Sequence, residues 1–173
     1  MKVYLIGYMG SGKSTLGRLL ADTLDLPFLD MDDEFELKYK IGIHDFFAKY
    51  GEDNFRKLEH NLLIDISLME DAVVSSGGGT PCFFNNMEIM NNTGTTVYLK
   101  SNSETLLKRL ETSPRRRPLV QMMNGGLTVE KLSEHLASRE KFYSLANIII
   151  PSSNPEIEEI KKMILLHLPN VTG

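Results

Sequence analysis

Residues 7–14, "GYMGSGKS", match the pattern G-x-x-x-x-G-K-[S/T] position by position. In such a loop, consecutive backbone N–H groups surround phosphate oxygens, and the start of the following helix adds partial positive charge. Lys13 would reach the outer phosphates, and the Ser14 hydroxyl would bind Mg²⁺. The pattern lies between an apolar strand-like run and a helical run, as the motif requires. It therefore predicts a site for a nucleoside triphosphate.

Two aspartates follow the second strand-like run, in "FLDMDDEFE". The carboxyl end of a strand is where ligands bind in open α/β sheets. Asp30 would hold the water shell of Mg²⁺, which keeps several waters and takes few carboxylates directly. Asp32 would accept a proton from an attacking hydroxyl. The alternative is that these acidic residues only complement a helix dipole, which is the preferred interpretation for Asp33 and Glu34.

The segment "NFRKLE" places Arg56 and Glu59 three residues apart, on one face of a predicted helix. Phe55 and Leu58 mark a buried face beside them. A partly buried glutamate would hold the guanidinium fork for a carboxylate ligand, which arginine binds with two parallel hydrogen bonds. The alternative is a surface ion pair of little energetic value.

Three consecutive glycines occur in "SSGGGTP", residues 75–81. Holding a glycine backbone still costs roughly 0.5–1 kcal/mol more than holding alanine. Either this segment is a flexible loop, or some group must approach the backbone more closely than a Cβ permits. A second segment, "ETSPRRRPLVQMMNGG" (111–126), is polar, basic and without strand or helix periodicity, and loops of that length are usually functional or disordered.

The elements that position these residues alternate along the chain. Five short apolar runs predict strands buried on both faces of a parallel sheet: 2–7, 27–31, 72–76, 95–100 and 147–150. Apolar residues at helical spacing lie between them, over 16–24, 55–69 and 157–168. The last helix is predicted to have Asn154 as N-cap and Pro155 as first residue. This alternation predicts an α/β fold with right-handed crossovers.

Length and composition favour one globular domain, with 173 residues of which 42% are hydrophobic and 24% charged. A net charge of −4 argues against nucleic-acid binding through bulk electrostatics. The single cysteine, Cys82, excludes an intramolecular disulfide and is typical of a reducing compartment. No apolar run is long enough to span a membrane, and no secretory signal pattern is present. We therefore expect a soluble, cytoplasmic protein that binds neither nucleic acid nor membrane.

Other nucleotide-binding classes fit less well. A GTPase switch would need D-x-x-G and N-K-x-D sequences, and neither occurs in the chain. The four histidines have no metal-ligand spacing and are expected to be surface or helix residues. A small kinase remains.

Together, the P-loop, the D-x-D pair, F-R-x-x-E, the three glycines, "RRRP" (115–118) and "SREKFY" (138–143) resemble the shikimate kinase family. The resemblance covers most of the chain, and the order and spacing of the motifs make it specific. It implies a nucleoside-monophosphate-kinase-like P-loop kinase fold, with a five-stranded parallel sheet flanked by helices. It also implies transfer of the γ-phosphate of ATP to the 3-hydroxyl of shikimate, giving shikimate 3-phosphate and ADP in chorismate biosynthesis.

The resemblance also assigns residues. For shikimate these are Asp32, Arg56, Gly77, Gly78, Gly79 and Arg139, the two arginines taking its carboxylate, Asp32 facing its hydroxyls and the glycines meeting its ring. For the nucleotide these are Gly10, Ser11, Gly12, Lys13, Ser14, Thr15, Arg109, Arg117, Asn154 and Pro155. Arg109 would cover the adenine, opposite Asn154 and Pro155. Ser152 and Ser153 stand where the family often has arginine, so contacts there would come from the backbone.

Lys13, Asp32 and Arg117 are the implied catalytic residues, with Mg²⁺ held by Ser14 and, through water, by Asp30. Arg117 is preferred to Arg115 and Arg116 as the lid arginine because Pro118 follows it. The expected organisation is a single, monomeric kinase domain over residues 1–173, with a shikimate-binding segment at about 32–60 and a lid at about 112–126. Two alternatives remain: another small-metabolite kinase such as a gluconate kinase, and a nucleotide-binding regulatory module without turnover.

Overall fold

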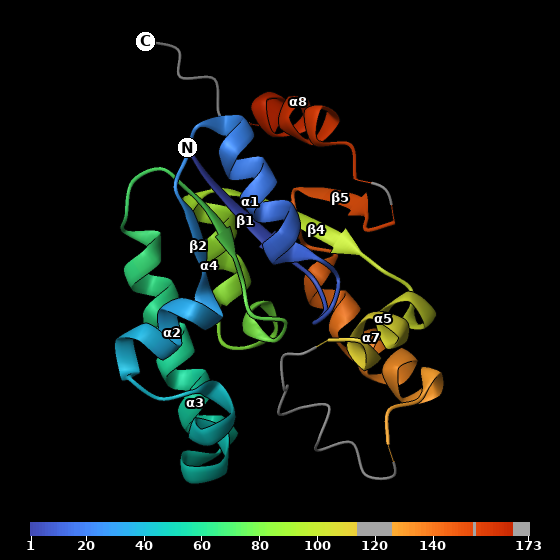
Figure 1. The fold of residues 1–173 in the computed structure, drawn as a ribbon. Helices are drawn as coiled ribbons and strands as arrows, with labels where there is room; N and C mark the ends of the chain where they lie inside the picture. The colour runs from blue at the N-terminus through green and yellow to red at the C-terminus, as the bar shows by residue number, and fades with distance from the viewer. Residues whose placement is uncertain (114–125, 154, 168–173) are drawn as a thin grey trace.

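A computed structural model describes residues 1–113, 126–153 and 155–167. Its strands form one parallel sheet in the order β2-β3-β1-β4-β5 (Figure 1). The strands are β1 (Lys2–Ile6), β2 (Phe28–Asp30), β3 (Ala72–Ser75), β4 (Thr95–Lys100) and β5 (Ile148–Pro151). The five predicted strands and their parallel arrangement are confirmed.

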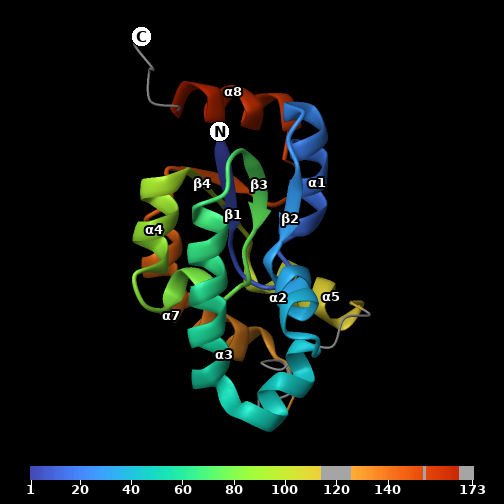
Figure 2. The same cartoon turned by 90° about the vertical axis from the view of Figure 1, so that its left-hand side faces the viewer.

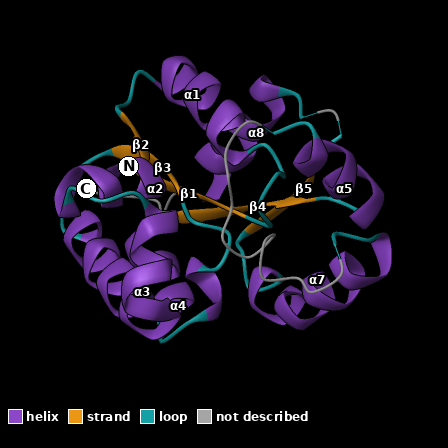
Figure 3. Ribbon diagram, turned by 60° about the horizontal axis from the view of Figure 1, so that its bottom comes forward, coloured by secondary structure: helices purple, strands orange, loops and turns teal. Residues whose placement is uncertain are grey.

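Helices cover both faces of this sheet. They are α1 (Lys13–Leu24), α2 (Met31–Tyr39), α3 (Ile43–Ser67), α4 (Asn86–Thr93), α5 (Ser103–Glu111), α7 (Val129–Tyr143) and α8 (Ile157–His167), with a 3₁₀ turn η1 (Thr80–Cys82). Helices α1 and α8 lie on one face, and α3, α4 and α7 lie on the other (Figure 3). Helices α2 and α5 lie at the end of the sheet to which β1 and β3 run (Figure 2). No helix in these ranges has the length and apolarity needed to cross a membrane.

The central strand β1 is buried along its whole length. Its residues alternate between two apolar clusters: Tyr4 and Ile6 pack with α3 and α4, whereas Val3 and Leu5 pack with α1 and α8. Such burial on both faces is typical of parallel sheets and explains the uninterrupted apolar sequence. The carboxyl end of β1, which leads into the P-loop, is therefore held rigidly by the core.

Two details of the sequence prediction are wrong. The edge strand β5 is buried on one face only, since Ile148 and Ile150 pack toward α8 while Ile149 is 47% exposed. Helix α8 begins at Ile157, not at Pro155, and the Ile160 N–H donates a hydrogen bond to the Glu156 carbonyl (3.1 Å) in its first turn. The predicted N-cap residue 154, and residue 168 at the far end, lie outside the described residues.

The turn from α4 into β4 provides a test of sheet packing. A Cβ at Gly94 would lie 2.6 Å from the backbone carbonyl oxygen of Lys2 in β1. Because that oxygen belongs to the central strand, Gly94→Ala should lower the free energy of unfolding by about 1–3 kcal/mol, measured by urea denaturation. At Gly42 the nearest atom would be 3.8 Å away, so Gly42→Ala should cost less. Equal losses for the two variants would contradict the packing described here.

Candidate active site

The loop between β1 and α1 has the backbone that the P-loop motif demands. Gly7, Gly10 and Gly12 have φ values of 142°, 80° and 100°, which side-chain-bearing residues rarely adopt. Gly12 is the N-cap of α1, so the amide groups of the first helical turn face the cleft without a side-chain cap. The loop is therefore shaped by its glycines to bind an anion at a helix N-terminus.

Two polar side chains of this loop are buried. The Lys13 ammonium donates hydrogen bonds to the carbonyls of Gly7 (2.9 Å) and Tyr8 (3.0 Å), across the loop. Among the buried side-chain groups of the described residues, the Ser11 hydroxyl is the one without a hydrogen-bond partner. A buried polar group without a partner costs free energy unless a ligand or water satisfies it. This loop therefore fits an oxygen-rich ligand such as a triphosphate.

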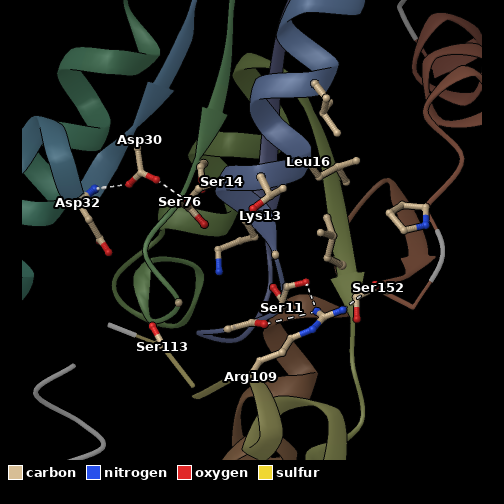
Figure 4. Close-up of a pocket in the computed structure, with 18 of the residues that line it drawn as sticks. Ser11, Lys13, Ser14, Leu16, Asp30, Asp32, Ser76, Arg109, Ser113 and Ser152 are labelled. Carbon is tan, nitrogen blue, oxygen red and sulfur yellow. Dashed lines mark hydrogen bonds between the residues drawn. The ribbon is translucent and has the colours of Figure 1, made fainter. Parts of the chain in front are cut away.

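Asp30 connects the P-loop helix to α2. Its carboxylate accepts a hydrogen bond from the Ser14 hydroxyl (2.5 Å) and another from the Asp32 backbone N–H (3.1 Å), so Asp30 is the N-cap of α2 (Figure 4). The Ser14 and Asp30 oxygens are hard ligands that suit Mg²⁺. No group of three or more His, Cys, Asp or Glu gathers within the described ranges, and Mg²⁺ does not require one because water and phosphate complete its shell.

A cleft of about 590 Å³ opens along the P-loop, and all the predicted nucleotide-binding residues that the structure describes line it. At one end Arg109 of α5 donates hydrogen bonds to the carbonyls of Ser11 (2.8 Å) and Ser152 (3.2 Å), which joins the P-loop to the β5–α8 connection (Figure 4). Ser153 and Pro155 also line this cleft. Residues 114–125 and 154, which include Arg115, Arg116, Arg117 and Asn154, lie outside the described residues.

A smaller cavity of about 70 Å³ adjoins the cleft, and Asp32 and Gly78 line both. All the predicted shikimate residues meet here: Asp32, Arg56, Gly77, Gly78, Gly79 and Arg139. They come from α2, α3, the segment after β3, and α7. The fold therefore brings the D-x-D pair, F-R-x-x-E and the glycine run to one place beside the P-loop.

Arg56 is 4% exposed and is held by two glutamates. Its Nη1 donates to Glu59 (2.9 Å), while Nε and Nη2 both donate to one oxygen of Glu52 (3.1 and 2.9 Å). Burial alone would lower the pKa of Arg56, but Glu59 and Glu52 outweigh it and raise that pKa. The Phe83 ring centre lies 4.4 Å from the guanidinium carbon. Neither Glu52 nor Phe83 was expected here from the sequence. The i, i+4 spacing of Glu52 and Arg56 could have indicated Glu52, whereas the sequence gives no signal for Phe83.

Arg139 on α7 is 5% exposed. Its Nη1 donates to the Gly78 carbonyl (3.1 Å), and the Tyr8 ring centre lies 5.6 Å from its guanidinium carbon. Within the described ranges, no carboxylate forms an ion pair with it. Because a buried charge without a counter-ion is costly, this arginine is suited to an anionic ligand entering the smaller cavity.

The glycine run is packed against the protein itself. A Cβ at Gly77 would lie 2.6 Å from a Glu59 carboxylate oxygen, and one at Gly79 would lie 2.6 Å from the Arg56 guanidinium. At Gly78 it would lie 2.9 Å from the backbone nitrogen of Met9 in the P-loop. The close approach inferred from the sequence is therefore present, but the groups that approach include the ion pair and the P-loop. The flexible-loop alternative does not fit, because the run turns directly into η1.

His135 is also part of this region, which its position in the sequence did not indicate. Its Nδ1 lies 2.6 Å from the Tyr8 hydroxyl. Burial lowers the pKa of His135, and the nearby Arg139 lowers it further. The lowered pKa favours the neutral ring, and the hydrogen bond between His135 and the Tyr8 hydroxyl links α7 to the P-loop.

A P-loop cleft that opens into a small cavity with two buried arginines and an aspartate defines a kinase that acts on a small anionic metabolite. The shikimate kinase family model matches residues 9–169. The chain is 44% identical over 147 residues to a shikimate kinase of Parabacteroides distasonis, covering 85% of each protein. The structure of a shikimate kinase from Acinetobacter baumannii in complex with shikimate has a TM-score of 0.85 and 33% identity, covering 99% of this chain and 95% of that one.

This chain therefore belongs to the shikimate kinase family. A gluconokinase from Sinorhizobium meliloti is also similar, with a TM-score of 0.51 and 17% identity, covering 95% of this chain and 89% of that one. At that identity the likeness extends to the fold alone. The P-loop kinase fold predicted from the sequence is confirmed.

The contact of His135 predicts a pH dependence of stability. Because the folded-state pKa lies below the ordinary value of 6.5, the unfolded chain binds this proton more readily. His135 therefore contributes stability at a pH above the pKa that it has in the unfolded chain. This contribution is lost as the pH falls below that pKa and through the folded-state pKa.

Thermal midpoints measured between about pH 7 and pH 5 should fall less steeply for His135→Gln than for the wild type. The exposed His167 provides the matched control, His167→Gln, whose slope should stay like that of the wild type. Identical slopes for wild type and His135→Gln would contradict the assignment.

Proposed function

We propose that this chain transfers the γ-phosphate of ATP to the 3-hydroxyl of shikimate, giving shikimate 3-phosphate and ADP for chorismate biosynthesis. Family membership and relatives named shikimate kinase support the reaction. The assignment of shikimate as substrate rests on Arg139. This residue is a buried cation without a counter-ion in the described residues, and it lines the same small cavity as Arg56. Shikimate supplies one carboxylate for this pair.

Arg56 retains suitable donors for that carboxylate. A guanidinium group carries five N–H bonds. The hydrogen bonds to Glu52 and Glu59 use Nε, one N–H of Nη1 and one N–H of Nη2, which leaves one N–H on each terminal nitrogen. Those two form a fork that matches the two oxygens of a carboxylate. Glu59 and Glu52 would hold the fork in place while the substrate binds.

Asp32 lies at the junction of the two cavities, between the predicted substrate and phosphate positions. We assign to it the orientation of the 3-hydroxyl and acceptance of its proton. Phosphoryl transfer depends mainly on positioning and charge neutralisation, for which we propose Lys13 and, from the family resemblance, Arg117. Mg²⁺ bound to Ser14, and through water to Asp30, would neutralise part of the triphosphate charge.

The organisation expected from the sequence belongs to the same proposal: one monomeric, cytoplasmic kinase domain, with shikimate binding at about 32–60 and a lid at about 112–126. Arg109 and Pro155, which both line the larger cleft, would contact the adenine of ATP. Neither a gluconate kinase nor a regulatory module without turnover is favoured by an observation in the described residues.

The substrate assignment is tested by coupling ADP release to a spectrophotometric assay with ATP and Mg²⁺. Shikimate should stimulate ADP formation, and removal of Mg²⁺ by a chelator should abolish it. Gluconate and nucleoside monophosphates serve as the matched alternative acceptors. Turnover with gluconate and none with shikimate would overturn the substrate, and tight ATP binding without any turnover would favour a regulatory module.

The roles of Arg56 and Asp32 are separated by steady-state kinetics. Loss of a buried charged contact costs on the order of 2–5 kcal/mol, so Arg56→Ala should raise the KM for shikimate at least tens-fold. Asp32→Asn should lower kcat by roughly 10²–10⁴-fold if Asp32 is the general base. The KM for ATP should change little in either variant. Arg18→Ala, on the exposed side of α1, should behave like the wild type. An unchanged shikimate KM for Arg56→Ala, or full kcat for Asp32→Asn, would refute the respective role.

A further inference from the structure

The carboxylate that holds Arg56 is itself held from its other side. Glu59 is 3% exposed, and one of its oxygens accepts the Arg56 bond. Its second oxygen accepts a hydrogen bond of 2.7 Å from the hydroxyl of Thr80, which is fully buried in η1. A buried carboxylate is stable only when hydrogen bonds satisfy both of its oxygens. Thr80 therefore completes the environment of Glu59.

Thr80 is fixed in turn by Asn86, the first residue of α4. The Asn86 side-chain NH₂ donates to the Thr80 carbonyl (2.8 Å), and its oxygen lies 2.5 Å from Nδ1 of His60. Since the amide nitrogen of Asn86 is the donor to Thr80, its oxygen is the acceptor and His60 donates. Asn86 is fully buried, whereas His60 is partly exposed and directly follows Glu59 on α3. The hydrogen bonds therefore run from His60 through Asn86 and Thr80 back to Glu59.

The glycine run makes room for this arrangement. A Cβ at Gly77 would lie 2.6 Å from the Glu59 oxygen that accepts the Thr80 bond, and 2.8 Å from the Thr80 hydroxyl. The Thr80 N–H also donates to the Gly77 carbonyl (3.2 Å), which sets the turn. The Thr80–Glu59 bond therefore occupies the space that a side chain at position 77 would fill.

We propose that Thr80 and Asn86 are positioning residues for the substrate carboxylate, acting through Glu59 on Arg56. The inference rests on the proposed function. With both Glu59 oxygens satisfied, one by Thr80 and one by Nη1, the remaining N–H on each terminal nitrogen of Arg56 stays available for the substrate. Without the Thr80 hydroxyl, the second Glu59 oxygen would be buried without a hydrogen-bond donor. It would then compete with the substrate carboxylate for the remaining N–H groups of Arg56.

The test removes the hydroxyl alone. Thr80→Val should raise the KM for shikimate about tenfold, the size expected for a hydrogen bond to a charged group, while kcat and the KM for ATP stay within about twofold. Thr80→Ser keeps the hydroxyl and should restore a KM near the wild-type value. If Thr80→Val does not fold, Thr80→Ala removes the same hydroxyl without adding a methyl group beside Gly77.

The matched control is Thr96→Val. Thr96 is also fully buried and its hydroxyl donates to Asn91 (2.6 Å), but it lies at the start of β4, outside both cavities. Thr96→Val should lower the thermal midpoint and leave the shikimate KM unchanged. If the role of Thr80 were merely structural, Thr80→Val would likewise lower the thermal midpoint and leave the shikimate KM unchanged.

A double variant tests the route through Glu59. In a Glu59→Gln background, Thr80→Val should add little to the rise in KM, because the carboxylate through which it acts is gone. The inference would be overturned by an unchanged shikimate KM in Thr80→Val and Thr80→Ala. It would also be overturned if the rise in KM caused by Thr80→Val added fully to the rise caused by Glu59→Gln. In either case an active wild type would still support the proposed function. A wild-type chain inactive with shikimate would instead refute the proposed function itself.

Discussion

The buried ion pair between Arg56 and Glu59 is the interaction on which the rest of the site depends. Two charges removed from water are stable only when their remaining hydrogen-bonding groups are satisfied. Glu52 and Thr80 supply those bonds, and Phe83 covers the guanidinium. The glycine run then packs directly on the pair, since side chains at 77 and 79 would collide with it. The cost of burying this pair therefore explains most of the unusual residues around the smaller cavity.

The second constraint is the parallel sheet, whose carboxyl end fixes the substrate side relative to the phosphate side. Gly78 contacts the P-loop backbone at Met9 and accepts hydrogen bonds from Arg139 and Tyr143. Asp30 joins β2 to the P-loop helix through Ser14. Met9 and Gly78 lie in loops that directly follow β1 and β3, whereas Ser14, Asp30, Arg139 and Tyr143 belong to helices or strands. The regular elements therefore hold both loops in place, so two reacting groups are kept at a constant separation. That is the main requirement of phosphoryl transfer.

Local patterns predicted much of this architecture. The strands and most helices could be predicted from the sequence because the spacing of their apolar residues reflects the burial of each segment against its immediate neighbours. The errors occur where neighbours are missing or irregular. The sequence 147–150 is as apolar as a central strand, yet β5 lies at the edge of the sheet with one face uncovered. Pro155 favours a first helical position, but α8 starts two residues later, at Ile157.

By itself, the sequence determined the phosphate-binding loop and the Arg56–Glu59 pair, because the loop conformation and the i, i+3 contact depend only on neighbouring residues. Only the tertiary structure decided that Thr80 holds Glu59 across 21 residues, that Arg139 reaches Gly78 across 61, and that Tyr8 meets His135 across 127. Such contacts are set by how α3, α7 and η1 pack on the sheet. No local pattern encodes that packing, because a hydrogen bond requires its two atoms to be placed within a few tenths of an ångström.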